Sequence, residues 1–88
     1  MNQSGATETF SRSGPWIISS RGFRVRALGR AGVEYVEGGK SLHVDSEALA
    51  IPAFVVYAQS LPTDARTSII DNLRRAWRSS GFDIQVHE

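Results

Sequence analysis

Four carboxylates gather in the middle of this chain, and their type suits them to acid–base chemistry. Glu34, Glu37, Asp45 and Glu47 lie between positions 33 and 50, where Lys40 is the one opposing charge. General acid–base catalysis needs a carboxyl group whose pKa is tuned by a desolvated pocket. No pattern around these four residues indicates such a pocket, so the sequence does not predict a catalytic pair.

The histidines and hydroxyl residues add no catalytic pattern. His43 and His87 are the two histidines, and neither has a neighbour at a metal-ligand spacing. The chain has no cysteine, which excludes thiolate sites and disulfides. Its serines and threonines form none of the nucleophile or phosphate-binding motifs. We therefore expect a protein that is not an enzyme, with no metal and no cofactor.

A basic segment precedes the acidic one. The stretch "RGFRVRALGR" holds Arg21, Arg24, Arg26 and Arg30, with Phe23 among them. Arginines beside an aromatic ring can bind RNA through phosphate contacts and base stacking. In a regular strand, however, Phe23 faces away from the arginines, and the net charge of the whole chain is only +1. The sequence thus favours a solvated strand face over a nucleic-acid site, and this basic face remains an alternative binding surface.

The elements that must position these side chains follow from periodicity. Apolar and polar residues alternate in "FRVRAL", "KSLHVD" and "FDIQVHE", as in half-buried strands. The run "AFVVYA" is apolar throughout and predicts a strand buried on both faces. Glycines between the early segments predict hairpin turns. The expected strands are 15–19, 23–28, 33–38, 40–45, 53–58 and 82–88.

One main helix is expected between the last two strands. Thr63 is the predicted cap and Gly81 the predicted stop. Apolar residues at helical spacing include Ile69, Leu73 and Trp77, and we expect Trp77 in the core. A single helical turn is also expected at 46–52. The fold class is therefore α+β: an antiparallel sheet of five or six strands, beginning as a meander, packed by one main C-terminal helix and closed by a short last strand.

With 88 residues the chain forms one domain. Residues 1–14 are small and polar and predict a flexible N-terminal arm, which leaves 15–88 as the single folded domain. No apolar run is long enough for a membrane span, and the start lacks the apolar core of a signal peptide. We expect no membrane association.

The order of motifs resembles the immunity protein 74 family of bacterial polymorphic toxin systems. A hairpin "YVEGGKSLHV" is followed by a bend bearing Glu47 and then by a strand of the F-V-V-Y type at 54–57. A helix with Ile70 and Asn72 comes next and ends at Gly81 before a short strand. The resemblance covers roughly residues 22–87. The chain departs from the family in having only "AQSLPTD" where the family often has a longer polar and aromatic loop.

The resemblance implies a function by binding alone. Such a protein binds a cognate toxin domain, often a nuclease, in the cytoplasm and neutralises it stoichiometrically. Because nucleases are basic where they hold nucleic acid, an acidic patch can mimic phosphates and accelerate association. The candidate contacts with the toxin are Glu34, Glu37, Asp45, Glu47, Tyr35 and His43.

Two alternatives remain open at this point. One is a small RNA-binding module that uses the basic segment, and the other is a subunit that forms a weak homodimer through a sheet edge. Steep loss of affinity with salt would indicate the first, because phosphate contacts release counterions.

Overall fold

A five-stranded antiparallel sheet forms the first half of the fold. The computed structural model describes residues 8–29, 32–48 and 53–87. The strands follow one another in the sheet in chain order, and they are β1 (Phe10–Ser13), β2 (Trp16–Ser19), β3 (Phe23–Ala27), β4 (Val33–Glu37) and β5 (Lys40–Val44). The two-residue turn between β4 and β5 consists of Gly38 and Gly39, both at positive φ, which glycine adopts without steric cost. The predicted meander is confirmed.

The predicted flexible arm at 1–14 is wrong for its last part. Phe10–Ser13 forms β1, which pairs with β2 in register Phe10↔Ser19 to Ser13↔Trp16. The ring of Phe10 packs edge-on against Phe23 with centroids 6.3 Å apart. This contact and the strand pairing outweigh the polar local composition, so the folded domain begins before residue 15.

A second, three-stranded sheet continues from the first. Strand β5 passes directly into β6 (Ser46–Ala48), with only Asp45 between the two strands. Strand β6 pairs antiparallel with β7 (Ala53–Tyr57), which pairs parallel with β8 (Asp83–His87). The helical turn expected from Ser46 is therefore wrong over 46–48, because pairing with β7 supplies backbone hydrogen bonds that an isolated turn lacks. Residues 49–52 lie outside the described part of the chain.

Parallel pairing of β7 and β8 requires a crossover, and the helical segments provide it. A short 3₁₀ helix η2 (Ala58–Ser60) leads to α1 (Arg66–Arg78). The expected cap Thr63 is wrong: α1 begins after Ala65, and no side chain caps it. The expected stop at Gly81 is confirmed. Gly81 has a φ of +84°, the Phe82 N–H donates to the Trp77 carbonyl, and the Gly81 N–H donates to the Arg78 carbonyl, which is a Schellman motif.

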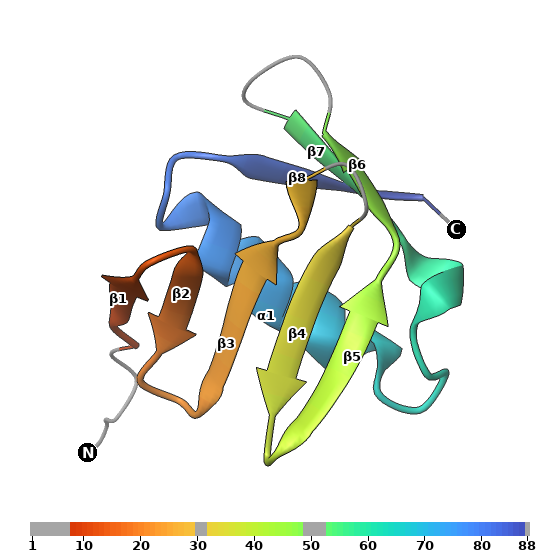
Figure 1. The fold of residues 1–88 in the computed structure, drawn as a ribbon. Coiled ribbons are helices and arrows are strands. Elements are labelled where there is room, and N and C mark those ends of the chain that lie inside the picture. Colours follow the sequence, from red (N-terminus) through yellow and green to blue (C-terminus); the bar gives the residue numbers. More distant parts are fainter. Residues whose placement is uncertain (1–7, 30–31, 49–52, 88) are drawn as a thin grey trace, which may run out of the picture.

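The core lies between α1 and the two sheets. Figure 1 shows α1 behind the five-stranded sheet. In this view β6, β7 and β8 gather at the upper end of that sheet. Alternate residues of the strands face the helix, and α1 contributes its apolar face, including Trp77 as expected. The buried core residues are Ile17, Phe23, Val25, Val33, Tyr35, Val44, Val56, Leu61, Ile69, Leu73, Ala76, Trp77 and Ile84. The α+β fold class is confirmed, with the strands divided between two sheets.

Within the described residues, no helix has the length and apolar character needed to cross a membrane.

Candidate partner-binding surfaces

The side of the five-stranded sheet opposite α1 is open to solvent. Strand registers place its side chains in two rows across β2 to β5. We call this surface the outer sheet face, and its rows are Ile18, Arg24, Val36 and Ser41, and Trp16, Arg26, Glu34 and His43. All eight residues are exposed or half-buried. A partner can therefore reach this face.

Trp16 lies at the centre of the cationic part of this face. The guanidinium carbons of Arg24 and Arg26 lie 4.4 and 4.9 Å from the Trp16 ring centroid. Cation–π contacts of this kind hold the three side chains together. The sequence interpretation missed Trp16, because it considered Phe23 as the only aromatic near these arginines. Pairing the two predicted strands 15–19 and 23–28 as a hairpin would have placed Trp16 beside Arg26.

Glu34 is held within this face and does not contribute a free negative charge. Its carboxylate accepts hydrogen bonds from Ser41 Oγ and Arg26 Nε, each at 2.7 Å. These bonds, first from Ser41 and then from Arg26, lower the pKa of Glu34. Because Arg26 balances its charge, Glu34 is a poor candidate for an acidic patch.

Tyr35 points the other way, into the core, and its prediction as a partner contact is wrong. It is only 2% exposed, and its ring stacks on Phe23 at 5.7 Å. Its hydroxyl donates to Glu37 and accepts from Asn72 Nδ2 at 2.8 Å. Burial, then the hydrogen bond to Glu37, raises the pKa of Tyr35 to about 12. The alternation of β4 puts Tyr35 on the helix side because the sheet must cover α1.

Glu37 is exposed, but it lies far from the other candidate acids. Glu37 lies opposite Lys40 in the strand register, at the hairpin end of β4. Asp45 follows Val44 at the other end of β5. The four carboxylates of the acidic segment therefore occupy three separate places, which a sequence-level charge sum cannot reveal.

The second surface is the outer side of the three-stranded sheet, which we call the acidic face. It combines the sheet-to-sheet junction with alternate residues of β6, β7 and β8. Its polar and aromatic members are Asp45, Glu47, Tyr57, Asp83, Gln85 and His87, and the half-buried Val55 lies between Glu47 and Gln85. The side chains of Asp45 and Asp83 are 63% and 69% exposed. Among the described residues, one cation pairs with this face across its rim, with Arg78 Nε 3.9 Å from Asp83 Oδ1. Tertiary pairing thus adds C-terminal residues to the predicted acidic segment.

Several contacts fix the geometry of the acidic face. The Tyr57 hydroxyl donates to Glu47 Oε1 at 2.8 Å, and this bond raises the pKa of Tyr57. The Tyr57 ring meets His87 edge-on at 5.6 Å. Ser60 Oγ accepts from the Asp45 N–H at 3.0 Å and donates to the Tyr57 carbonyl at 2.8 Å. A hollow of ≈ 560 Å³ is bordered by Asp45, Tyr57, Gln59, Ser60 and His87. The carboxylates are therefore presented by an ordered frame.

His43 joins the two surfaces. It lies on the outer sheet face, and its Nδ1 is 3.4 Å from Asp45 Oδ1. Since Ser41, His43, Asp45 and Glu47 alternate along one nearly continuous strand, the outer sheet face runs into the acidic face. The expectation that His43 and Asp45 belong to one surface agrees with this position.

The predicted basic segment is only partly assembled. Arg24 and Arg26 share the outer sheet face, whereas Arg21 is exposed in the β2–β3 turn. Arg30 lies outside the described residues. No group of three histidine, aspartate or glutamate side chains within the described part of the chain is placed to hold a metal ion.

A buried polar network behind the five-stranded sheet was not predicted. Glu8 accepts from Arg75 Nε at 2.6 Å and from Ser19 Oγ, and Arg75 Nη2 donates to Asn72 Oδ1 at 2.6 Å. Asn72 continues to Tyr35. Burial of the Glu8 carboxylate opposes its ionisation, but the bonds from Arg75 and Ser19 outweigh burial and lower the pKa of Glu8. This network joins the N-terminal segment to α1 and has a structural role.

Comparison of the chain with protein-family models, curated proteins and solved structures found no match. The resemblance to the immunity protein 74 family therefore stays a prediction, and function must be argued from the two surfaces.

Proposed function

We propose that this chain is an immunity protein that neutralises a cognate bacterial toxin domain, a nuclease, by stoichiometric binding in the cytoplasm of the producing cell. The observation that carries the proposal is the acidic face, on which Asp45 and Glu47 flank Tyr57 while Asp83 adds a carboxylate at the far end of β8. Tyrosine is among the residue types that most often anchor protein interfaces. Carboxylates around such an anchor complement a basic, nucleic-acid-binding surface.

The ordered frame of the acidic face supports rapid and specific binding. Glu47 is oriented by the Tyr57 hydroxyl, and the backbone at Asp45 is held by Ser60. Groups fixed before association lose less conformational entropy when they bind. Exposed charges of one sign attract an oppositely charged partner over about a Debye length, ~8 Å at physiological salt. The face can therefore steer a basic toxin domain and then retain it.

The proposed contact set differs from the sequence prediction. Asp45, Glu47 and His43 are retained, because they lie together on one exposed strand face. Glu34 is excluded by its ion pair with Arg26, and Tyr35 by burial. The added contacts are Tyr57, Asp83 and His87.

The proposal is tested first by capture from the native host. The tagged chain is used to isolate partners from lysate, and the co-purifying chain is freed under denaturing conditions and assayed for nuclease activity. A one-to-one partner that cleaves RNA or DNA when freed, and is silent when the chain is added back, is the expected result. Absence of an inhibited partner would contradict the immunity function.

A charge reversal then tests the surface. The double variant Asp45→Lys with Glu47→Lys should slow association with the toxin about tenfold or more, because electrostatic steering is reversed. The matched control, Asp64→Lys with Asp71→Lys, makes the same change in net charge near or on α1 and should leave binding nearly unchanged. Equal effects of both variants would show that overall charge, not the acidic face, governs association.

RNA binding by the outer sheet face is the second candidate function. It is favoured by Trp16, which supplies beside Arg24 and Arg26 the aromatic ring that Phe23 cannot. Two features oppose it: Glu34 neutralises Arg26, and the adjoining acidic face repels phosphates. Binding of single-stranded oligouridylate that weakens steeply with salt would support this candidate over the first.

A further inference from the structure

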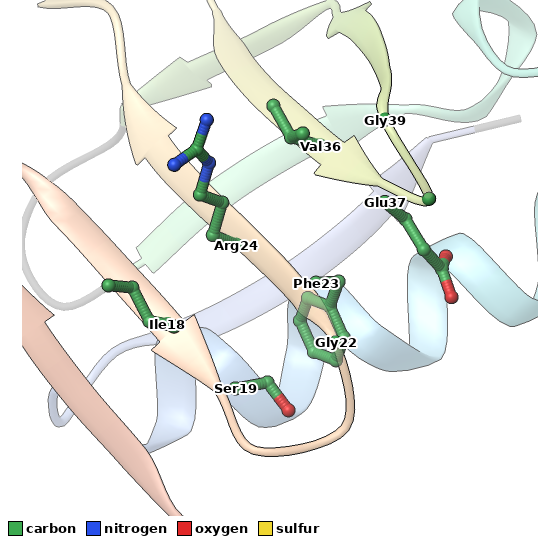
Figure 2. Close-up of a pocket in the computed structure, with 9 residues that line it drawn as sticks. Ile18, Ser19, Gly22, Phe23, Arg24, Val36, Glu37 and Gly39 are labelled. Carbon is green, nitrogen blue, oxygen red and sulfur yellow. The ribbon is translucent and has the colours of Figure 1, made fainter.

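A shallow hollow lies at the hairpin end of the outer sheet face. Figure 2 shows Ile18, Arg24 and Val36 side by side on neighbouring strands and pointing to the solvent side, whereas Phe23 and Glu37 point toward α1. The volume of the hollow is ≈ 210 Å³. For comparison, an apolar cavity of about 150 Å³ is enough to hold benzene. The hollow is therefore large enough for one apolar side chain.

Glycines from two turns line this hollow. Gly22, Gly38 and Gly39 line it, and all three have positive φ. A Cβ atom added at any of them would meet no heavy atom within 4 Å, so the space around these turns is free. On the solvent side its walls are the aliphatic side chains of Ile18 and Val36, both half-buried. Ser19, Phe23 and Glu37 line its inner edge, where the Glu37 carboxylate accepts a hydrogen bond from the Tyr35 hydroxyl. The hollow is thus apolar in its walls and accessible from solvent.

Arg24 gives the hollow a charged rim. Among the residues that the structure describes, no carboxylate forms an ion pair with Arg24, whereas Arg26 is neutralised by Glu34. Arg24 is instead held over Trp16, which orients its guanidinium beside the apolar walls. A planar guanidinium recognises a carboxylate through two parallel hydrogen bonds. Tryptophan and arginine are also the side chains most enriched at energetic hot spots of interfaces.

We propose that the outer sheet face binds an acidic–aliphatic segment of a protein partner. An aliphatic side chain enters the hollow between Ile18 and Val36, and a neighbouring carboxylate pairs with Arg24 against Trp16. This inference deepens the proposed immunity function and rests on it for the identity of the partner: the acidic face steers the toxin, and this hollow anchors it.

Charge distribution favours a protein segment over nucleic acid as the occupant. The row behind Arg24 contains Glu34, and the surface continues through His43 to Asp45 and the acidic face. A phosphate backbone needs several cations along its path, whereas Arg24 is the one arginine among the described residues of this face that has no carboxylate partner. One carboxylate flanked by an apolar side chain matches one unpaired guanidinium flanked by apolar walls.

The test uses short peptides and the full chain, without the toxin. Amide and indole N–H signals of the ¹⁵N-labelled chain are followed by NMR during titration to about 1 mM with three capped peptides, Glu-Leu-Glu, Glu-Gly-Glu and Lys-Leu-Lys, and with oligouridylate. We expect Glu-Leu-Glu to shift the Trp16 indole signal and the amides of Ile18, Arg24 and Val36. The other peptides should shift them at least about fivefold less, because each lacks one of the two matched groups.

Two variants separate this site from general charge effects. Arg24→Glu should abolish the shifts by placing like charges together, whereas Arg78→Glu, an exposed arginine at the end of α1, should preserve them. The spectrum of each variant also reports whether it is folded. Equal shifts by Glu-Leu-Glu and Glu-Gly-Glu, no shifts at all, or shifts by oligouridylate alone would each overturn the inference.

The peptide titration and the capture of a partner from the host can fail separately. If the peptides bind but no inhibited toxin is recovered from the host, the hollow is a docking site and the immunity function fails. If a toxin is recovered but the peptides do not bind, the immunity function stands and the anchoring surface lies elsewhere, with the acidic face.

Discussion

Replacing Glu8 by glutamine should destabilise the whole domain, although Glu8 lies in a segment with a polar, strand-poor sequence. The side chain of Glu8 is only 6% exposed and that of its partner Arg75 is 28% exposed. Glu8→Gln keeps the shape of the side chain but removes its charge. The perturbation therefore tests the ion pair, with little change in packing.

The expected loss of unfolding free energy depends on which bonds Glu8 and Arg75 lose and which Arg75 keeps. Breaking a fully buried ion pair costs about 3–5 kcal/mol, and a hydrogen bond to a charged group contributes about 1.5–3 kcal/mol. Arg75 is partly solvated and keeps its bonds to Asp71 and Asn72, which reduces the loss. We expect the free energy of unfolding to fall by about 2 kcal/mol. For a domain of this size, that lowers Tm by roughly 8–16 °C.

The assay is urea and thermal unfolding followed by circular dichroism, at pH 7 and at lower pH. Because the folded-state pKa of Glu8 is lowered, its stabilising contribution is complete above the unfolded-state value near 4.5 and is lost as pH falls through the folded-state pKa. The difference between the wild type and Glu8→Gln should therefore be full at pH 7 and shrink below pH 4.5. Asp64→Asn, an exposed carboxylate, is the control and should change stability by less than about 0.5 kcal/mol.

If Glu8→Gln and Asp64→Asn unfold at the same urea concentration, the ion pair does not stabilise the fold and the reasoning is wrong. A loss of stability at pH 7 that persists unchanged at pH 3 would instead show that the side-chain shape, and not its charge, was responsible.

Two further predictions concern strand β4 and the residue that precedes it. Gly32→Ala should reduce the free energy of unfolding by about 2 kcal/mol or more. Gly32 has a φ of +115°, and a Cβ atom there would lie 2.6 Å from the Val44 carbonyl oxygen. If the variant unfolds in urea as the wild type does, this close approach is absent. Tyr35→Phe should cost about 1–2 kcal/mol by leaving Glu37 and Asn72 without their shared partner. In an absorbance titration of the tyrosine phenols, the ionisation near pH 12 should be absent from this variant. If the variant instead lacks an ionisation near pH 10, the Tyr35 hydroxyl is not held in the network.

The local architecture could be predicted because it depends on neighbouring residues. Alternation in "FRVRAL" and "KSLHVD" assigns each residue to a strand face, and Gly38 with Gly39 permits only a tight turn. Helical spacing placed Leu73 and Trp77 in the core for the same reason. Each of these features involves side chains a few positions apart, so hydrophobic periodicity and turn chemistry are sufficient to specify it.

The candidate surfaces could be predicted only in part. The sequence indicated that Arg24 and Arg26 share a face, since they are separated by two positions in a strand. It grouped Asp45 and Glu47 only as parts of one acidic segment, because a helical turn was expected at 46–52 where β6 lies. It grouped Glu34 and Glu37 with the same patch by charge, although strand alternation, already visible in the sequence, puts them on opposite faces. The ion pair of Glu34 with Arg26 became visible only in the structure. Trp16 was missed because its role depends on which strand lies beside it.

The sequence by itself determined the meander, the main helix with its glycine stop, and the division of each strand into an inner and an outer face. The tertiary structure decided the rest: β8 pairing in parallel with β7, Asp83 and His87 joining the acidic face, and Glu8 reaching Arg75 across 67 positions. Contacts of that kind join segments with no local relation in the sequence. Their stability depends on closing a loop around a shared core, and only the folded chain supplies that geometry.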